Sequence, residues 1–261
     1  MTKTNKNVSR KQTYTKKSNI VNIYGKHSVE SAIKNPERLI NKILCSQDHF
    51  DHFDSLCKEN DKKHIEIKVV DKREITNHLT SDATHQGVMA QAKPLELYSI
   101  EEVCALANNK ENCNVIILDQ VTDPHNVGAI IRSAAAFGTL AVILTDKNSP
   151  NETGSMCKTS AGTIEYMPVC KVLNLARALD VLKKAGFWTI GMDGHAKQTV
   201  SSVNKAGKNA IVMGSEGKGM RRLTEENCDI TIKLPMAKNV ESLNVSTAAS
   251  IVLYEFSKDL L

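Results

Sequence analysis

From residue 114 onward, short apolar runs alternate with segments of helical periodicity. The apolar runs are VIILD, AVILTD, IEYMPV, WTIGMD, AIVMG and DITIKLP. Runs that are apolar at nearly every position are typical of strands buried on both faces, and strands that alternate with helices form parallel sheets. We therefore predict an α/β fold for residues 113–261, with a mostly parallel sheet covered by helices on both faces. In such sheets the ligand site lies beyond the carboxyl ends of the strands.

The first part of the chain shows the same alternation on a smaller scale. Residues 20–95 alternate short apolar runs with polar helical segments near 26–34, 48–60 and 71–80, which predicts a small α/β domain. Residues 96–112 contain a helix-like stretch, IEEVCALA, and then the polar run NNKENCN. We interpret this segment as a linker between two domains.

The amino terminus carries most of the net charge of +5. Residues 1–19 hold six lysines and arginines and no acidic residue, and the rest of the chain is almost neutral. Such a tail is usually disordered, and it either contacts a polyanion such as nucleic acid or keeps the protein soluble. It has neither the apolar core of a signal peptide nor the amphipathic face of a transit sequence. No stretch reaches the ~18 apolar residues of a membrane helix, so we predict a cytoplasmic protein.

No metal site is predicted. The seven cysteines are odd in number, widely spaced and without a CxxC pair, which fits reduced thiols better than disulfides or structural zinc. His49 and His52 are the only close pair of histidines. Without a third ligand nearby, we interpret them as surface residues of a helix.

Polar residues cluster at a strand-to-helix corner near the end of the chain. Residues 232–256, IKLPMAKNVESLNVSTAASIVLYEF, join a strand that ends at Pro235 to an apolar helix. The loop between them carries four polar residues, Glu241, Ser242, Asn244 and Ser246. Asn244 or Ser246 could simply cap the helix, or these side chains could serve a site.

A glycine-rich corner follows the strand AIVMG. Residues 209–221, NAIVMGSEGKGMR, contain Gly214, Gly217 and Gly219, with Glu216 among them. Three glycines in six residues let the backbone approach a ligand closely, although a flexible hairpin tip would show the same pattern. The spacing matches neither GxGxxG nor GxxxxGK[ST], which disfavours a nucleotide-dependent oxidoreductase or NTPase.

A third corner follows the strand VIILD. Asp123, Pro124 and Asn126 are predicted to form a turn before a helix that starts near Gly128, which places Arg132 on an otherwise apolar helix. An isolated arginine there usually reaches to the surface or pairs with a carboxylate. Because all three corners follow apolar strands, one cleft can collect their polar groups, and this favours a binding site.

Three segments of this half resemble the ordered motifs of a known family. They are NVGAIIRSAAAFG, IVMGSEGKGM and IKLPMAKNVESLNVSTAASIVLYE, and they are similar to the motifs of the SpoU (TrmH-like) branch of the SPOUT-class RNA 2′-O-ribose methyltransferases. The resemblance covers residues 114–256. The segments IYGKHSVESAI at 23–33 and HQGVMAQ at 85–91 resemble the ribosomal-protein-like substrate-binding domain of enzymes that modify guanosine in large-subunit ribosomal RNA.

The resemblance implies a reaction and an assembly. The implied methyl donor is S-adenosylmethionine. The implied acceptor is a ribose 2′-hydroxyl of a guanosine in 23S ribosomal RNA. Transfer RNA is the alternative substrate. A non-catalytic RNA-binding module of the same fold is a further alternative, disfavoured because an inactive site has no need of five polar groups. The family also implies a homodimer and a C-terminal trefoil knot, which no sequence pattern could reveal because knots are almost absent from proteins.

By resemblance, five residues match the catalytic positions of the family: Asn126, Arg132, Glu216, Ser242 and Asn244. Five others match its cofactor-binding positions: Gly214, Gly217, Leu234, Met236 and Leu243. The pKa of a guanidinium lies above ~12, so an arginine is a poor general base. We therefore expect Arg132 to hold a phosphate and to stabilise the developing alkoxide. Glu216 and Asn244 are expected to orient it. The chain has Lys238 where most relatives have glycine, and we expect Asn239 to adopt the left-handed conformation instead.

Overall fold

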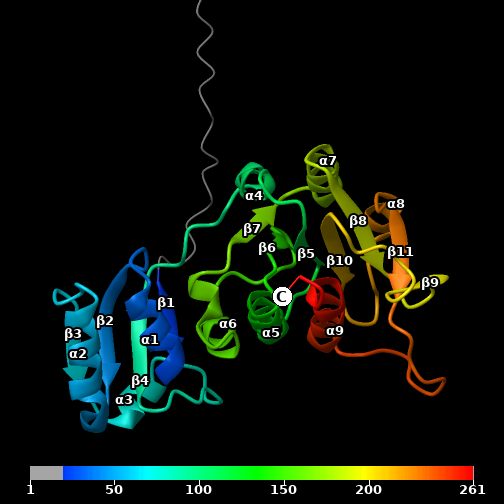
Figure 1. The fold of residues 1–261 in the computed structure, drawn as a ribbon. Coiled ribbons are helices and arrows are strands. Elements are labelled where there is room, and N and C mark those ends of the chain that lie inside the picture. The colour runs from blue at the N-terminus through cyan, green and yellow to red at the C-terminus, as the bar shows by residue number, and fades with distance from the viewer. Residues whose placement is uncertain (1–19, 261) are drawn as a thin grey trace, which may run out of the picture.

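The computed structural model describes residues 20–260, and the basic tail predicted for residues 1–19 lies outside them. These described residues form two sheets, one of four strands and one of seven (Figure 1). Within residues 20–260, no helix has the length and apolar character needed to cross a membrane.

The first sheet has the strand order β1-β4-β2-β3. Its strands are β1 (Val21–Tyr24), β2 (Ile40–Cys45), β3 (Glu66–Val69) and β4 (Val88–Ala92). β4 runs antiparallel to β1 and β2, whereas β3 is parallel to β2. The helical segments of this half are α1 (Lys26–Lys34), η1 (Gln47–His49), α2 (Phe50–Glu59) and α3 (Lys72–Thr76), close to the predicted ranges. The edge strand β3 is mostly exposed and carries charged residues, which protects the sheet from pairing with other chains.

The second sheet is parallel throughout and has the order β7-β6-β5-β10-β8-β11-β9. Its strands are β5 (Cys113–Asp119), β6 (Ala141–Thr145), β7 (Val169–Val172), β8 (Phe187–Met192), β9 (Gln198–Thr199), β10 (Lys208–Gly214) and β11 (Ile230–Lys233). The central strand β5 is buried at every position, as expected for a parallel strand covered on both sides. The α/β fold predicted from the apolar runs is confirmed.

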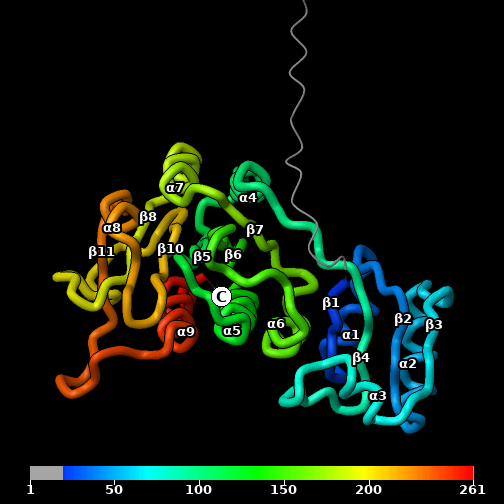
Figure 2. The backbone as a smooth tube through the Cα atoms, turned by 180° about the vertical axis from the view of Figure 1, so that it is seen from behind, coloured from blue at the N-terminus to red at the C-terminus, as the bar shows by residue number. Residues whose placement is uncertain are grey.

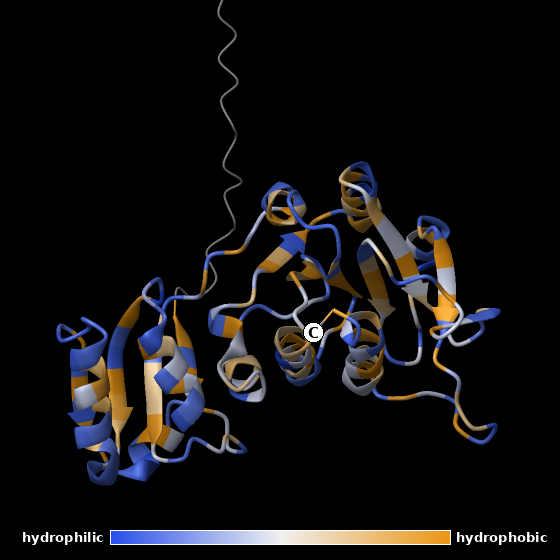
Figure 3. Ribbon diagram, viewed as in Figure 1, coloured by the Kyte–Doolittle hydropathy of each residue, from blue (hydrophilic) through white to orange (hydrophobic). Residues whose placement is uncertain are grey.

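Helices cover both faces of this sheet (Figures 1 and 2). One face carries α5 (Pro124–Ala136), α6 (Gly154–Thr159) and α9 (Val245–Ser257). The other carries α4 (Ile100–Ala107), α7 (Leu175–Lys184) and α8 (Arg222–Glu226). Hydrophobic residues concentrate in the strands and on the helix surfaces that face them (Figure 3), and they form a separate apolar cluster on each side of the sheet.

Two local predictions in this half are wrong. α5 begins at Pro124, not near Gly128, because the Asp123 carboxylate accepts a hydrogen bond from the His125 backbone N–H (2.9 Å) and proline is favoured in a first helical turn. The run IEYMPV is not a strand: a 3₁₀ helix covers Thr163–Glu165, and β7 starts only after Pro168. Proline lacks the donor that a strand interior requires.

The segment predicted as a linker packs against the large sheet. The backbone N–H of Tyr98 donates to the carbonyl of Val169 (2.9 Å), and Tyr98 bridges Cys170 of β7. α4 coincides with the predicted helical stretch and begins with a capping box between Ser99 and Glu102. The connection between the two sheets is therefore held in place along β7.

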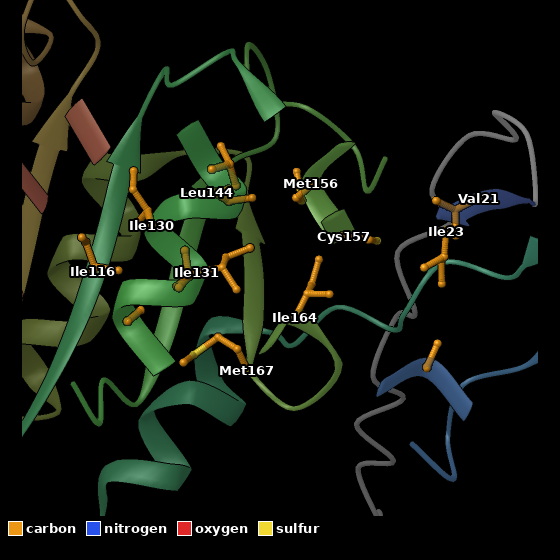
Figure 4. Close-up of a cluster of buried hydrophobic side chains, with 14 of the residues drawn as sticks. Val21, Ile23, Ile116, Ile130, Ile131, Leu144, Met156, Cys157, Ile164 and Met167 are labelled. Atoms are coloured by element: carbon orange, nitrogen blue, oxygen red, sulfur yellow. The ribbon is translucent and has the colours of Figure 1, made fainter. Parts of the chain in front are cut away.

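The larger apolar cluster is continuous between the two halves of the chain. Figure 4 shows Ile130 of α5 near Ile116 of β5, and Met156 of α6 between that group and Ile23 of β1. Close packing here depends on glycine, since a Cβ at Gly154 would lie 2.1 Å from the carbonyl oxygen of Asn22. The first sheet therefore packs directly on α6.

Arg38 forms a buried ion cluster across the same boundary. Its side chain is fully buried, and its Nη1 and Nη2 lie 2.7 Å from Glu152 and 2.8 Å from Glu165. Nε donates to the second oxygen of Glu165 (2.9 Å), and Nη1 donates to the carbonyl of Lys93 (2.8 Å). Because burial removes these charges from water, each partner is needed to offset the desolvation of the others.

Glu165→Ala is expected to destabilise the protein strongly, because it leaves the buried guanidinium of Arg38 without two hydrogen bonds. Removing one partner of a buried ion pair costs about 3–5 kcal/mol. Urea unfolding should give a much lower free energy of unfolding for this variant than for the control Glu37→Ala, which removes an exposed carboxylate beside Arg38. Equal stability of the two variants would show that the cluster does not hold the halves together.

The cysteines and histidines form no metal-binding group within residues 20–260. All seven cysteines are free thiols, and five of them are buried. Burial raises the pKa of Cys170 and of Cys228 to about 12, which keeps these thiols protonated and weakly reactive. His52 lies on α2 and contacts Glu30 (2.7 Å), in agreement with a surface position.

Candidate active site

Three loops meet at the carboxyl edge of the large sheet. They follow β5, β10 and β11 and lead into α5, α8 and α9 (Figure 1). The loops after β10 and β11, together with the end of β8, enclose a cleft of about 310 Å³. This volume lies at the lower end of the range for small-molecule pockets. The cleft lies at the sheet edge that the sequence predicted for a ligand.

The loop after β10 is a tight hairpin. Ser215 and Gly219 exchange backbone hydrogen bonds of 3.1 and 2.9 Å. Gly217 and Gly219 have φ angles of 75° and 65°, which favour glycine. A Cβ at Gly214 would lie 2.1 Å from the carbonyl carbon of Gly219, so the chain can fold back over this position only if it is glycine. Glu216 is thereby presented between α5 and α9.

Glu216 is the centre of a polar network. Its Oε1 accepts hydrogen bonds from Asn244 Nδ2 (2.6 Å), the Val245 backbone N–H (3.1 Å) and Asn126 Nδ2 (3.2 Å). Asn244 Nδ2 also donates to Asn126 Oδ1 (3.0 Å). One carboxylate thus joins the hairpin to the first turns of α5 and α9, whose positive dipole ends favour a negative charge.

Asn244 has two structural tasks. Its Oδ1 accepts hydrogen bonds from the backbone N–H groups of Ser246 (2.9 Å) and Thr247 (3.4 Å), so it caps α9. Its Nδ2 donates to the network around Glu216. The sequence-based prediction that Asn244 could cap the helix is confirmed. The same residue also belongs to the polar network of the candidate site.

Arg132 and Ser242 lie outside this network. Arg132 is exposed on α5, and the arginines that form ion pairs within residues 20–260 are others: Arg38, Arg221 and Arg222. Within residues 20–260, Glu216 and Asn244 bond to Asn126, to each other and to backbone N–H groups of α9, so their orientation of Arg132 stays a prediction. Ser242 is exposed in the loop after β11 and lines the cleft.

The five residues predicted to bind a cofactor all line the cleft, namely Gly214, Gly217, Leu234, Met236 and Leu243. The apolar side chains of Met213 and Val245 also line it, and both are buried. Because polar side chains such as Glu216 and Ser242 line the cleft together with the apolar ones and with glycine backbone, it suits a ligand of nucleoside type, which has both apolar and polar surfaces.

β8 contributes cleft residues that sequence reasoning missed. Asp193, Gly194 and His195 directly follow this strand and line the cleft, and Asp193 Oδ1 accepts a hydrogen bond from the backbone N–H of His195 (3.1 Å). The sequence could have indicated these residues, because WTIGMD was already predicted to be a strand of the sheet. Polar residues at its carboxyl end belong to the same sheet edge as the other corners.

The loop after β11 accommodates Lys238 in an ordinary turn. The backbone N–H of Val240 donates to the carbonyl of Ala237 (3.0 Å), with Lys238 and Asn239 between them. Neither central residue has a positive φ. The prediction of a left-handed Asn239 is wrong, since a turn with negative φ at both central positions, as in type I, accepts most residues.

Comparison with known families assigns both halves of the chain. Residues 114–254 match the model of the SpoU rRNA Methylase family. This chain belongs to the SpoU rRNA methylase family. Residues 22–98 match a second model, described as RNA 2′-O ribose methyltransferase substrate binding. The family resemblance of the three motifs is confirmed.

Relatives of this SpoU family member include two proteins named 23S rRNA (guanosine-2′-O-)-methyltransferase RlmB. The one from Photobacterium profundum is 38% identical over 89% of this chain and 95% of its own length. The one from Pasteurella multocida is 38% identical over 92% of this chain and 98% of its own length.

Solved structures share the fold at lower sequence identity. The SpoU methyltransferase AviRb from Streptomyces viridochromogenes, in complex with the cofactor AdoMet, is 20% identical with a TM-score of 0.77, over 93% of this chain and 91% of that chain. An AdoMet-bound rRNA methyltransferase from Sinorhizobium meliloti is 18% identical with a TM-score of 0.78, over 93% and 88%. These two structures support the α/β parallel-sheet fold.

Proposed function

We propose that this chain transfers a methyl group from S-adenosylmethionine to the 2′-hydroxyl of a guanosine in 23S ribosomal RNA. The observation that carries the proposal is the network of Asn126, Glu216 and Asn244 beside the cleft. Support for this reaction and this RNA comes from the relatives, whose names state the activity and whose sequences match along 95–98% of their length.

The cleft is assigned to S-adenosylmethionine, which when bound supplies a methyl group carried by a positively charged sulfur. Gly214, Gly217, Leu234, Met236 and Leu243 are its proposed contacts, on the loops after β10 and β11. Two observations support the fit between this ligand and the cleft. A side chain has no room at Gly214, and apolar side chains form part of the cleft wall. Recognition by backbone groups explains glycines that follow neither phosphate-binding motif.

The five polar residues are assigned to positioning and charge stabilisation. Methyl transfer is an in-line displacement, so the main contribution of the protein is to align the hydroxyl with the methyl group. The bonds among Asn126, Glu216 and Asn244 fix the hairpin, α5 and α9 relative to one another. Arginine is a cation with a planar set of donors, so Arg132 is assigned to an RNA phosphate and to the charge that develops on the 2′-oxygen. Ser242, exposed at the cleft, is assigned to the nucleotide.

The first domain, residues 20–95, is assigned to RNA binding, in line with the substrate-binding model that matches residues 22–98. Residues 96–112 connect it to the methyltransferase domain, residues 113–261. The buried cluster around Arg38 supports a fixed distance between RNA held by the first domain and the cleft. Transfer RNA is the alternative substrate.

A trefoil knot in residues 113–261 is part of this proposal. It is supported by the path of the last segment, since the loops after β10 and β11 line one cleft and α9 then packs against α5, β5 and β10. Knots are rare, so the knot rests on family membership together with this path.

A homodimer is also proposed, through the outer surface of α9. Ile251 and Tyr254 are 40% and 50% exposed on this helix, and the ring of Phe137 packs edge-on against Tyr254 with centroids 5.7 Å apart. A two-fold interface buries the same patch of both copies, so a second chain can cover this apolar surface.

Mixing two strongly impaired variants is expected to restore activity. If the dimer brings Arg132 of one chain to Glu216 of the other, a heterodimer of Arg132→Ala and Glu216→Ala chains contains one intact site. Random exchange should then recover about a quarter of wild-type activity, since half of the dimers are mixed and each has one good site. No recovery in a mixture that sedimentation shows to be dimeric would place each site within one chain. A monomer at micromolar concentration would refute the dimer.

Mapping of 2′-O-methyl groups tests the function in cells. A strain that lacks the gene should lose one 2′-O-methylguanosine from 23S ribosomal RNA, and the wild-type gene, but not Arg132→Ala, should restore it. Loss of a methyl group from transfer RNA alone would favour the alternative substrate. Unchanged methylation of both RNAs would refute the proposal.

A further inference from the structure

Arg221, just after the hairpin, is anchored by a buried carboxylate that has no part in the network around Glu216. Asp119 is the last residue of β5, and its side chain is completely buried. Its Oδ1 accepts a hydrogen bond from Nε of Arg221 (2.8 Å), and its Oδ2 accepts one from the backbone N–H of Arg221 (3.0 Å). Both carboxylate oxygens are therefore bonded to one residue.

This pair closes the base of the hairpin. Gly214 is the register partner of Asp119 across β10 and β5, so the hairpin leaves the sheet beside Asp119. The chain then folds back so tightly that a Cβ at Gly214 would lie 2.2 Å from the backbone nitrogen of Met220. Arg221 follows immediately and is bonded to the end of β5. Both ends of the segment from Gly214 to Arg221 are thus fixed at the same strand end.

We infer that Asp119 and Arg221 are positioning residues that hold Glu216 in place between α5 and α9. This inference rests on the proposed function. Glu216 is bonded on one side to groups of α5 and α9, and its hairpin is tied on the other side to β5. A guanidinium held to a fully buried carboxylate is screened less by water and salt than a pair between two exposed side chains.

Asp119→Asn changes the hydrogen-bonding groups of the side chain but hardly changes its volume. An asparagine has one acceptor oxygen, whereas both Nε and the backbone N–H of Arg221 are donors. In Asp119→Asn the amide NH₂ therefore faces a donor, and one of the two bonds is lost. Arg221→Ala removes the side-chain bond but keeps the backbone N–H that donates to Asp119, so the buried carboxylate still has a partner and this variant should fold. Arg222→Ala is the matched control, because that side chain is exposed and its ion-pair partner within residues 20–260 is Glu226 at the surface.

Hydrogen exchange of the full-length protein without ligand is the first test. Arg221→Ala and Asp119→Asn should speed the exchange of the Ser215 and Gly219 amides by about tenfold, since the lost bond is worth about one hydrogen bond to a charged group. The amides of β5 and the control Arg222→Ala should exchange as in the wild type. Unchanged exchange at Ser215 and Gly219 in both variants would overturn the inference.

A double-mutant cycle on single-turnover methyl transfer is the second test. At saturating RNA and S-adenosylmethionine, Arg221→Ala should lower the rate by about 10- to 100-fold, as small misplacements of a reacting group do. In a Glu216→Ala background the same change should lower it by less than about twofold, because the residue that it positions is gone. Equal losses in both backgrounds would assign the pair to general stability. A wild-type chain without activity would contradict the proposed function, while hydrogen exchange would still decide the role of the pair.

Discussion

Gly214→Val is expected to abolish binding of S-adenosylmethionine while the chain still folds. A Cβ at this position would lie 2.1 Å from backbone atoms of Gly219, so the hairpin must move, and the hairpin is one wall of the cleft. Calorimetry should show a loss of at least about 100-fold in affinity, which corresponds to about 2.7 kcal/mol. The wild-type protein should bind S-adenosylmethionine but neither NAD nor ATP.

Gly207→Ala is the control for this prediction. Gly207 has a φ of +90°, and a Cβ there would meet no atom within 4 Å. The variant should lose stability, by about 1–2 kcal/mol for a left-handed alanine, but keep its affinity for S-adenosylmethionine. Unchanged affinity of Gly214→Val would remove the loop after β10 from the cofactor site.

Arg132→Lys is expected to lose nearly as much activity as Arg132→Ala. If Arg132 holds a phosphate through two parallel hydrogen bonds, a lysine keeps the charge but not the planar pair of donors. Both variants should lower the single-turnover rate by about 10²–10³-fold, the usual loss for one group that stabilises developing charge. Calorimetry should show wild-type affinity for S-adenosylmethionine in both, because Arg132 lies on α5 and does not line the cleft.

Arg177→Ala is a suitable comparison, because it removes an exposed arginine from α7 on the opposite face of the sheet. This control should keep the full rate. A lysine variant with close to wild-type activity would rule out recognition by the planar guanidinium and leave Arg132 with charge alone.

The architecture of the large sheet could be predicted because short runs of sequence determine its strands and helices. The run VIILD is apolar at four successive positions, and strand β5 is buried throughout. The same patterns placed the polar corners at the carboxyl edge, where Asn126, Glu216 and Asn244 do meet. Their detailed bonding could not be predicted, because it depends on the close approach of segments about 30 to 120 residues apart.

Two of the failures arise from contacts between segments that are distant in the sequence. The run IEYMPV is mostly apolar, as a buried strand is, but Glu165 in it is bonded to Arg38, which lies 127 residues earlier in the chain. Asp119 was recognised only as the end of a strand, since nothing near it in the sequence indicates that Arg221 will pair with it. Lys238 was misjudged for a different reason: the comparison with glycine in relatives suggested a left-handed residue, whereas this loop forms a turn that needs none.

The most direct test of the account is methyl transfer by the purified chain to an unmodified transcript of 23S ribosomal RNA. With S-adenosylmethionine labelled in the methyl group, we expect label in a single 2′-O-methylguanosine, and far less label when Gly214→Val or Arg132→Ala replaces the wild type. Label on a base, on another nucleotide or only on transfer RNA would contradict the assigned acceptor. No transfer to either RNA by a protein that binds S-adenosylmethionine would contradict the central claim.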